Sequence, residues 1–379
     1  MFQLTDEQQA MVHMVRDFAA DALAPHAVEW DQTKHFPVDV LREAAALGMG
    51  GIYVQEDVGG SGLTRGDAVL IFEELAKGDP SIAAYLSIHN MVAWMIDTFG
   101  TDEQRHRWVP DLTTMDALGS YCLTEPDAGS DAGALRTRAE RDGDEYVLNG
   151  TKQFISGAGA SSTYVVMART GDTGSQGISA FVVAADTPGL SFGPNEKKMG
   201  WNAQPTRQVI FDNLRVPVAN RLGAEGDGFA IAMKGLNGGR VNVGACSIGG
   251  AQWALDQSVA YLKQRSAFGK PLIEKQALLF ELADMDTELE TARTMLWRAA
   301  DALDRGADDA VRLCAMAKRV ATDAGFSVAN RAIQLHGGYG YLAEYGIEKV
   351  MRDLRVHQIL EGSNEIMRLI IGRNLADKR

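Results

Sequence analysis

A single carboxylate near the C-terminus, Glu361, has neighbours that suit a general base. It follows the apolar pair Ile359-Leu360 and precedes a glycine, and the next residues, Ser363 and Asn364, are good N-caps for a helix. Apolar neighbours raise the pKa of a carboxylate, and the free N–H groups of a helix start attract an anion. The segment therefore suggests C–H deprotonation beside a phosphate-bearing cofactor. An ordinary capped helix with a surface glutamate explains it equally well.

Two polar loops at the ends of predicted strands could face a planar ring. The run from Tyr121 to Ser130 is rich in hydroxyl groups and glycine, and such a loop can present N–H and O–H groups to a ligand. Phe154 ends another strand and could lie along a ring, with Ser156 donating a hydrogen bond to it. Taken alone, the first run is better explained as a Pro-Gly turn, and Phe154 as a core aromatic residue.

Glycines mark three helical stretches in the C-terminal third. Asn237-Gly238-Gly239-Arg240 lies inside a predicted helix, where each glycine costs about 1 kcal/mol relative to alanine. Either a ligand approaches there, with Arg240 placed to bind it, or two helices cross closely. The loop 265–269 ends this same helix and the loop 334–340 ends a later one, both with glycine, which is also the ordinary way to end a helix. Together with the helix start at Ser363, these loops would suit the pyrophosphate of a dinucleotide.

Composition and missing motifs argue against several other classes. A net charge of −13 disfavours general binding to nucleic acid or to an anionic membrane. The three cysteines are far apart, and we find no CxxC pair, no GxGxxG after a strand, no P-loop, no GxSxG and no HExxH. A Rossmann fold, a serine-hydrolase elbow and a metal site therefore gain no support. The N-terminus has no basic leader pattern, so we expect a soluble protein without a targeting segment or a membrane span.

The order of predicted elements divides the chain into three domains. Residues 1–117 form an α-helical domain, residues 118–226 a small β-barrel or sandwich domain, and residues 227–379 a four-helix bundle. The expected fold class is therefore α+β and multidomain, with turns such as Asn149-Gly150 between the strands. The expected helices cover residues 6–26, 38–47, 67–77, 81–99, 102–112, 229–265, 274–305, 308–335 and 363–376.

In this order, the segments resemble the acyl-CoA dehydrogenase family over essentially the whole chain. The likeness is carried by Gly200-Trp-Asn-Ala-Gln-Pro-Thr206, Gly235-Leu-Asn-Gly-Gly-Arg240, Gln334-Leu-His-Gly-Gly-Tyr-Gly-Tyr341 and Val356-His-Gln-Ile-Leu-Glu-Gly-Ser-Asn-Glu365. The resemblance implies FAD between the β domain and the bundle, an acyl-CoA thioester on the face of the flavin, and electron transfer to an electron-transfer flavoprotein. It also implies a homotetramer built as a dimer of dimers. The compartment would be the cytoplasm of a bacterium, or the mitochondrial matrix for a mature eukaryotic chain.

By this resemblance, Glu361 occupies the position of the catalytic base. It would remove the α-proton of the thioester while hydride leaves the β-carbon for flavin N5, and its backbone N–H and a ribityl hydroxyl of FAD would stabilise the enolate oxygen. Several of the implied FAD contacts would be made across a subunit interface. The implied FAD contacts are Tyr121, Leu123, Thr124, Gly129, Ser130, Phe154, Ile155, Ser156, Arg265, Phe268, Gln276, Gln334, Gly337, Gly338, Ser363, Asn364 and Glu365. The implied substrate contacts are Ser130, Asn237, Arg240, Leu360, Gly362 and Arg373.

Three local departures indicate a branch of this family. Leu360 stands where many straight-chain members have tyrosine, and Phe154 where they often have tryptophan; both match the isobutyryl type of valine breakdown. Gly239 stands where the isovaleryl type carries a displaced base, which a glycine cannot replace. We therefore expect a short branched acyl-CoA as substrate, isobutyryl-CoA first. A dehydrogenase for 2-methylbutyryl-CoA or butyryl-CoA, an acyl-CoA oxidase and a non-catalytic acyl-CoA-binding scaffold remain as alternatives.

Overall fold

Threonine-capped helices build much of the N-terminal part of the chain. The computed structural model describes residues 3–172 and 174–376. Thr5, Thr64 and Thr101 each accept a hydrogen bond from the third backbone N–H of the helix that follows, which starts α1, α4 and α6. The helices of this part are α1 (Asp6–Phe18), α2 (Ala27–Thr33), α3 (Val38–Ala46), α4 (Arg65–Gly78), α5 (Pro80–Phe99) and α6 (Asp102–Thr113).

The first helix is shorter than the sequence predicts. A single helix over residues 6–26 is wrong, because α1 ends at Phe18 and a π-helical turn follows over Ala19–Leu23. Pro25 lies in the turn before α2, and a proline has no N–H to continue a helical ladder. Met1 and Phe2 of the expected N-terminal segment lie outside the described residues.

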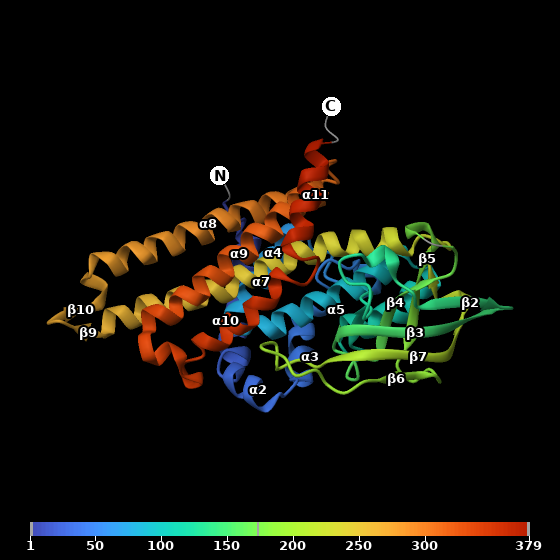
Figure 1. Cartoon of the computed structure of the whole chain (residues 1–379), viewed down its shortest axis with the longest axis horizontal. Helices are drawn as coiled ribbons and strands as arrows, with labels where there is room; N and C mark the ends of the chain where they lie inside the picture. Colours follow the sequence, from blue (N-terminus) through green and yellow to red (C-terminus); the bar gives the residue numbers. More distant parts are fainter. Residues whose placement is uncertain (1–2, 173, 377–379) are drawn as a thin grey trace.

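An eight-stranded sheet forms the middle of the chain (Figure 1). Its strands run in the order β6-β7-β3-β2-β4-β5-β8, and β1 pairs parallel with β4, which places Tyr121 beside Val165. The predicted turn at Asn149-Gly150 is wrong: β3 continues through it, and a bulge against β7 absorbs Gly150 at a φ of +151°. The strands are β1 (Gly119–Cys122), β2 (Arg138–Asp142), β3 (Glu145–Ser156), β4 (Thr163–Arg169), β5 (Ile178–Ala184), β6 (Leu190–Phe192), β7 (Thr206–Pro217) and β8 (Arg221–Leu222).

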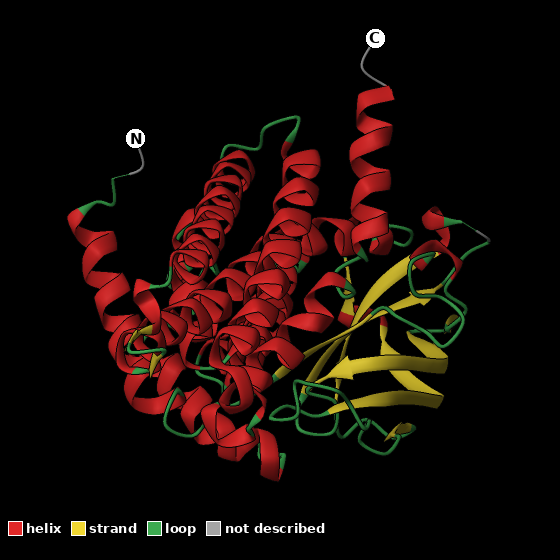
Figure 2. Ribbon diagram, turned by 60° about the vertical axis from the view of Figure 1, so that its left-hand side comes forward, coloured by secondary structure: helices red, strands yellow, loops and turns green. Residues whose placement is uncertain are grey.

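Long helices form the C-terminal part. Helix α7 (Gly228–Gln264) runs from beside β5 to a hairpin of β9 (Ser266–Ala267) and β10 (Lys270–Pro271) at the opposite end of the molecule (Figure 1). Helices α8 (Gln276–Asp304) and α9 (Ala310–His336) pack along it, and α11 (Asn364–Ala376) contacts α9 while its C-terminal end projects from the molecule (Figure 2). The order of helices, sheet and helices confirms the predicted three-part α+β fold.

One helix of this part, α10 (Ile347–Arg355), is absent from the sequence prediction. Its apolar residues Ile347, Val350 and Leu354 recur at helical spacing, a signal that a segment of nine residues carries only weakly. Buried ion pairs fix this helix: Lys349 contacts Asp79 of the α5 N-cap at 3.1 Å and Asp353 at 2.8 Å. Because α10 leads directly into residues 356–361, these contacts help to place Glu361.

The helices of the N- and C-terminal parts share one apolar core. Helices α4 and α5 pack against α7, and buried side chains of all three belong to the same cluster. One set of strand side chains packs around Tyr146, Tyr164 and Phe181, while others, such as Val165 and Val182, share a further cluster with residues of α5 and α6. In the described ranges 3–172 and 174–376, no helix combines the length and the apolar character needed to cross a membrane.

Candidate active site

The turn that carries Glu361 has a strained backbone. Glu361 has a φ of +57° and Gly362 a φ of +90°, so two consecutive residues are left-handed. For a residue other than glycine this conformation costs roughly 1–2 kcal/mol. A cation supports the turn, because Arg240 Nε donates to the Glu361 carbonyl oxygen at 3.1 Å. Strain that is held in place at a single carboxylate is typical of functional sites. We call residues 360–363 the base turn.

One oxygen of the Glu361 carboxylate has no hydrogen-bonding partner among the described residues. The residue as a whole is half-buried, but its Oε2 atom is covered and receives no hydrogen bond from the described residues. Burial raises the pKa of Glu361 to about 7, against the opposing charges of Arg240 and Lys318. The direction agrees with the expectation from its apolar neighbours. A carboxylate that titrates near neutral pH is suited to accept a proton from carbon.

The two glycines of α7 make room for side chains of this same chain. A Cβ on Gly239 would lie 2.7 Å from Glu361 Oε2, and one on Gly238 would lie 2.6 Å from an Arg65 guanidinium nitrogen. Close approach was one of the two explanations left open by the sequence, and the approaching groups are the base and a cation. Any larger residue at 239 would displace the Glu361 carboxylate.

The guanidinium group of Arg240 forms hydrogen bonds within the protein. It is buried, and besides its bond to Glu361 it donates from a terminal nitrogen to Asn237 Oδ1 at 2.8 Å. These two predicted substrate contacts are therefore brought together with the base. The structure gives them a supporting role in the base turn, and a contact with CoA is a separate role that they could also have.

A second unpartnered polar atom lies in the same neighbourhood. The Tyr121 hydroxyl is buried and makes no hydrogen bond with the described residues. Burial raises the pKa of Tyr121 well above its usual value, and the nearby Glu361 charge adds to the effect. Buried polar groups without partners are rare in folded proteins. Two of them together mark a place where a polar ligand belongs.

The rest of the 121–130 segment is held in place by buried contacts at its start, whereas its tip is exposed. Glu125 forms a buried ion pair with Lys152 at 2.9 Å, and Lys152 also donates to the Leu123 carbonyl. Beyond the partly buried Thr124, the predicted contacts Gly129 and Ser130 are exposed, and a Cβ on Gly129 would meet nothing within 4 Å. The loop tip is therefore free to receive a ligand.

The strand end at 154–156 exposes one aromatic ring. Phe154 is 64% exposed with a φ of +59°, at a bulge of β3. The interpretation of Phe154 as a core aromatic is wrong, because the left-handed residue turns its ring outwards. Ile155 is buried in the β core instead, and Ser156 Oγ accepts a hydrogen bond from Gln204 at 3.4 Å.

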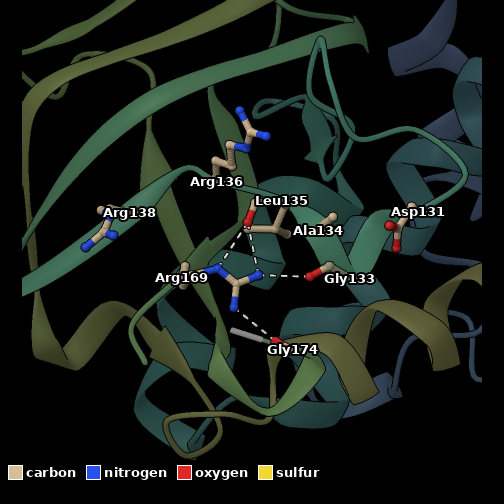
Figure 3. Close-up of a pocket in the computed structure, with 8 residues that line it drawn as sticks. All are labelled: Asp131, Gly133, Ala134, Leu135, Arg136, Arg138, Arg169 and Gly174. Atoms are coloured by element: carbon tan, nitrogen blue, oxygen red, sulfur yellow. Dashed lines mark hydrogen bonds between the residues drawn. The ribbon is translucent and has the colours of Figure 1, made fainter. Parts of the chain in front are cut away.

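A pocket beside the 121–130 segment contains a cation whose donors are all used within the protein (Figure 3). Its central cation, Arg169, donates to the carbonyls of Gly133, Leu135, Asp172 and Gly174 and so has no guanidinium edge left for a ligand. Glu361 is not among the residues that line it, and no part of the chemistry is assigned to it.

Six of the predicted FAD contacts lie at the other end of α7. Arg265 stacks over Tyr339 at 5.9 Å, which joins the loop after α7 to the loop after α9. From Arg240 to Arg265 the helix rises about 38 Å at 1.5 Å per residue. These residues are exposed and do not meet Glu361 within one chain. The group consists of Arg265, Phe268, Gln276, Gln334, Gly337 and Gly338.

The predicted contacts after Glu361 divide into inward and outward residues. Ser363 directly precedes α11, as expected for an N-cap position. Asn364 is buried and bonded to Lys318, Thr322 and Asp323, so its amide is already in use. Glu365 is exposed, and bonds within the first turn of α11 lower its pKa. Arg373 is exposed on the last turn of α11, while Leu360 packs against the helical core.

Sequence reasoning missed three residues of this neighbourhood. Lys318 is buried on α9 and bonds the base turn. Arg65 stacks on Tyr53 at 3.5 Å, beside Gly238. A lysine flanked by apolar residues, as in Ala315-Met-Ala-Lys318, is a signal that could have been noticed. Arg65 and Tyr53 carry no comparable signal. Among the described residues no cluster of His, Cys, Asp or Glu could hold a metal ion.

Comparisons with known proteins give a consistent picture. Three domain models of acyl-CoA dehydrogenases match the chain: the N-terminal domain at residues 5–116, the middle domain at 120–214 and the C-terminal domain at 226–376. Mitochondrial isobutyryl-CoA dehydrogenase of Bos taurus is 56% identical over 372 residues, which cover 98% of this chain and 89% of that protein.

Two solved structures resemble the chain over its whole length. Butyryl-CoA dehydrogenase of Megasphaera elsdenii has a TM-score of 0.96 at 40% identity and covers 99% of this chain and 100% of its own. A chain in the structural study of the electron transferring flavoprotein of Acidaminococcus fermentans has a TM-score of 0.97 at 39% identity, with both chains covered completely.

Proposed function

Because this chain belongs to the acyl-CoA dehydrogenase family, we propose that it dehydrogenates a short branched acyl-CoA, isobutyryl-CoA first, with Glu361 as the base. It is an oxidoreductase of a family that depends on FAD. The observation that carries the proposal is the covered, unpartnered Glu361 carboxylate opposite Gly239, with a pKa of about 7. Few groups in the chain are placed so well to take a proton from carbon.

Glu361 would remove the α-proton of the thioester. The α-hydrogen of a thioester is a weak acid, so the base needs a pKa near the working pH and a fixed geometry. Burial provides the first, and the Arg240 bond to the Glu361 carbonyl provides the second. The Glu361 backbone N–H would donate to the thioester oxygen and so stabilise developing negative charge. FAD, when bound, accepts the hydride that leaves the β-carbon.

The residues around Tyr121 are suited to FAD. Its buried, unpartnered hydroxyl provides a polar contact, the open tip at Gly129 leaves the backbone accessible, and the exposed ring of Phe154 provides a flat apolar surface. We assign Tyr121, Leu123, Thr124, Gly129, Ser130, Phe154, Ile155 and Ser156 to the flavin side of the site, with Ser363 to Glu365 close by.

The exposed group at the far end of α7 supports an oligomer. Phe268 is 94% exposed on the β9–β10 hairpin, and Arg265 lies about 38 Å along α7 from Arg240. If these residues contact FAD, they contact the FAD of another subunit. This supports the homotetramer, and the projecting α11 with its exposed Leu369 and Leu375 provides further apolar surface for assembly (Figure 2).

The preferred substrate and the electron acceptor follow from relatives. The 56% identity to bovine isobutyryl-CoA dehydrogenase, together with Leu360 before the base, favours isobutyryl-CoA. The likeness to a chain from the study of an electron transferring flavoprotein favours such a flavoprotein as acceptor over oxygen. The bovine relative is mitochondrial, which favours the matrix if the chain is eukaryotic, and the bacterial cytoplasm otherwise.

Anaerobic titration of the FAD-loaded protein tests the proposal. Isobutyryl-CoA should bleach the flavin absorbance, with a higher kcat/KM than butyryl-CoA or 2-methylbutyryl-CoA. Reduced protein should be reoxidised by electron-transfer flavoprotein faster than by air. A protein that binds FAD but is bleached by no C4 or C5 acyl-CoA would refute the proposed activity, and rapid reoxidation by oxygen alone would indicate an oxidase.

A further inference from the structure

A second cation holds the base turn, from a different helix than Arg240. Lys318 of α9 is fully buried, and its Nζ donates to the Gly362 carbonyl oxygen at 2.9 Å. Arg240 of α7 donates to the carbonyl of the preceding residue, Glu361, at 3.1 Å. Two consecutive carbonyls, which belong to the two left-handed residues, are thus held by cations from two different helices.

Side chains of α9 also form hydrogen bonds with residues on both sides of the base turn. Lys318 Nζ also donates to Asn364 Oδ1 at 2.9 Å, and Asn364 Nδ2 donates to Asp323 at 2.7 Å. Gln358, on the other flank, donates to the same Asp323 oxygen at 2.7 Å. One face of α9 therefore contacts the chain before and after Glu361, with Lys318 at its centre.

We propose that Lys318 is a positioning residue for Glu361: its ammonium group fixes the left-handed turn from the α9 side and places a positive charge beside the carboxylate. This inference rests on the proposed role of Glu361 as the base. Neither cation bonds the carboxylate itself, so both act on the base without occupying the oxygen that must accept the proton.

The charges around the Glu361 carboxylate determine the direction in which loss of the Lys318 charge should shift its pKa. Arg240 from α7 and Lys318 from α9 both act to lower the pKa of Glu361, which burial holds at about 7. Burial lowers the pKa of Lys318 itself to about 8, while Glu361, Asp323 and Glu365 act to raise it. Lys318 is therefore largely charged at and below pH 7, where Glu361 gains its proton. Loss of that charge removes a stabilising partner of the carboxylate.

Other titratable groups near the turn do not substitute for this charge. His357 is buried, and burial lowers its pKa to about 3, so the imidazole is neutral near pH 7. Tyr53 and Tyr121 are buried with raised pKa values and are neutral as well. Arg368 of α11 pairs with Glu365 at 3.1 Å on the surface.

Three variants of the FAD-loaded protein test the inference. Lys318→Met removes the charge and the donor, Lys318→Gln removes the charge but keeps a donor, and Arg312→Met is the matched control. Arg312 lies on the same helix, α9, and its guanidinium pairs with Asp309 at 2.7 Å and, among the described residues, makes no bond to the base turn or its flanks. The measurement is the rate of anaerobic flavin reduction by isobutyryl-CoA between pH 5.5 and 9, with flavin content and thermal melting recorded for each variant.

We expect the acid limb of the profile, where Glu361 gains its proton, to move up in both Lys318 variants. A shift of about one pH unit would lower the relative rate at pH 6 about tenfold. The maximal rate at high pH should fall in Lys318→Met and stay within about threefold of wild type in Lys318→Gln, because glutamine can still bond the Gly362 carbonyl. Arg312→Met should keep the wild-type limb.

The titration of Glu361 can also be followed without turnover. A protonated-carboxyl infrared band that is absent in Glu361→Gln reports its pKa directly in the FAD-loaded protein. An unmoved band and an unmoved acid limb in a folded Lys318→Met would overturn the inference, and if that variant does not fold, Lys318→Gln decides in the same way. A moved band in a protein that acyl-CoA does not bleach would refute the proposed activity while leaving the coupling of Lys318 to Glu361 established.

Discussion

Two carboxylates of this chain, the buried Glu125 and the half-buried Glu361, lie near cations but have opposite properties. Glu125 bonds Lys152 directly at 2.9 Å and accepts from the backbone N–H groups of Arg136 and Thr137. Burial acts to raise its pKa, but the charge of Lys152 and these donors outweigh burial, so the pKa of Glu125 lies below its usual value. Glu361 is close to two cations, yet its pKa is about 7.

The difference lies in the atoms to which the cations are bonded. Arg240 and Lys318 donate to the carbonyl oxygens of Glu361 and Gly362, while the Glu361 carboxylate keeps an unpartnered oxygen. In Glu125 the protein's hydrogen bonds and the charge of Lys152 stabilise the ionised form, so this carboxylate stays an anion. A carboxylate becomes a base when its backbone is held firmly and its side chain is left without donors.

Removing each carboxylate should therefore affect different properties, and the largest effect is expected at Glu361. Glu361→Gln keeps the shape but cannot accept a proton, so the rate of flavin reduction by isobutyryl-CoA should fall by about 10²–10⁴-fold. FAD content and acyl-CoA binding should persist. Stopped-flow bleaching of the FAD-loaded variant measures the rate. A near-normal rate would show that the base lies elsewhere.

Glu125→Gln should leave the chemistry intact and weaken the fold. Lys152 would lose its partner inside the protein, and breaking a buried ion pair from one side costs about 3–5 kcal/mol. We expect a clear loss of unfolding free energy in urea, while the rate of reduction per bound flavin stays close to that of wild type. A stable Glu125→Gln protein with a greatly reduced rate would reverse the roles assigned to the two residues.

The sequence predicts the position and the raised pKa of Glu361, but not the long-range hydrogen bonds that hold its backbone. The loop position of Glu361, its raised pKa and the helix start at Ser363 follow from local residue types, and the structure confirms them. The bonds from Arg240 and Lys318 join residues more than forty positions apart, and no local pattern encodes them. The three-part order of helices, strands and helices follows from residue periodicity, whereas the family resemblance implies where a cofactor would lie between these parts.

Errors of the sequence prediction occur where tertiary contacts override local signals. Asn149-Gly150 is a strong turn signal, yet pairing of β3 with β7 carries the strand through it as a bulge. Taken alone, Phe154 is predicted in the core, but a left-handed backbone turns it outwards. The resemblance implies that several FAD contacts cross a subunit interface, which stays a prediction, and the length of α7 between Arg240 and Arg265 is its physical reason.

The pH dependence of stability should also separate the two carboxylates. The pKa of Glu361 is raised in the folded state, so ionising it destabilises the fold as the pH rises from about 4.5 through 7. Relative to wild type, Glu361→Gln should therefore gain unfolding free energy with rising pH, on the order of 2 kcal/mol by pH 8. The lowered pKa of Glu125 predicts the opposite, a stabilising contribution that is lost as the pH falls below about 4.5. Thermal unfolding of wild type and both variants at pH 4, 6 and 8 would show two slopes of opposite sign, and parallel curves would contradict the comparison.

The smallest expected effect concerns the residue before the base. Leu360 packs against the helical core at the start of the base turn, and a tyrosine there is larger and adds a hydroxyl beside the carboxylate. It would take the room that an α-methyl branch needs, so Leu360→Tyr should lower the kcat/KM ratio of isobutyryl-CoA to butyryl-CoA about tenfold, or about 1.4 kcal/mol in the transition state.

Ile359→Tyr is the matched control, because Ile359 is 54% exposed and the same group would lie in solvent there. The two ratios are measured by steady-state kinetics with electron-transfer flavoprotein as acceptor. If both variants keep the wild-type ratio, Leu360 does not select the branch, and the choice between α-branched and straight substrates lies deeper in the acyl pocket.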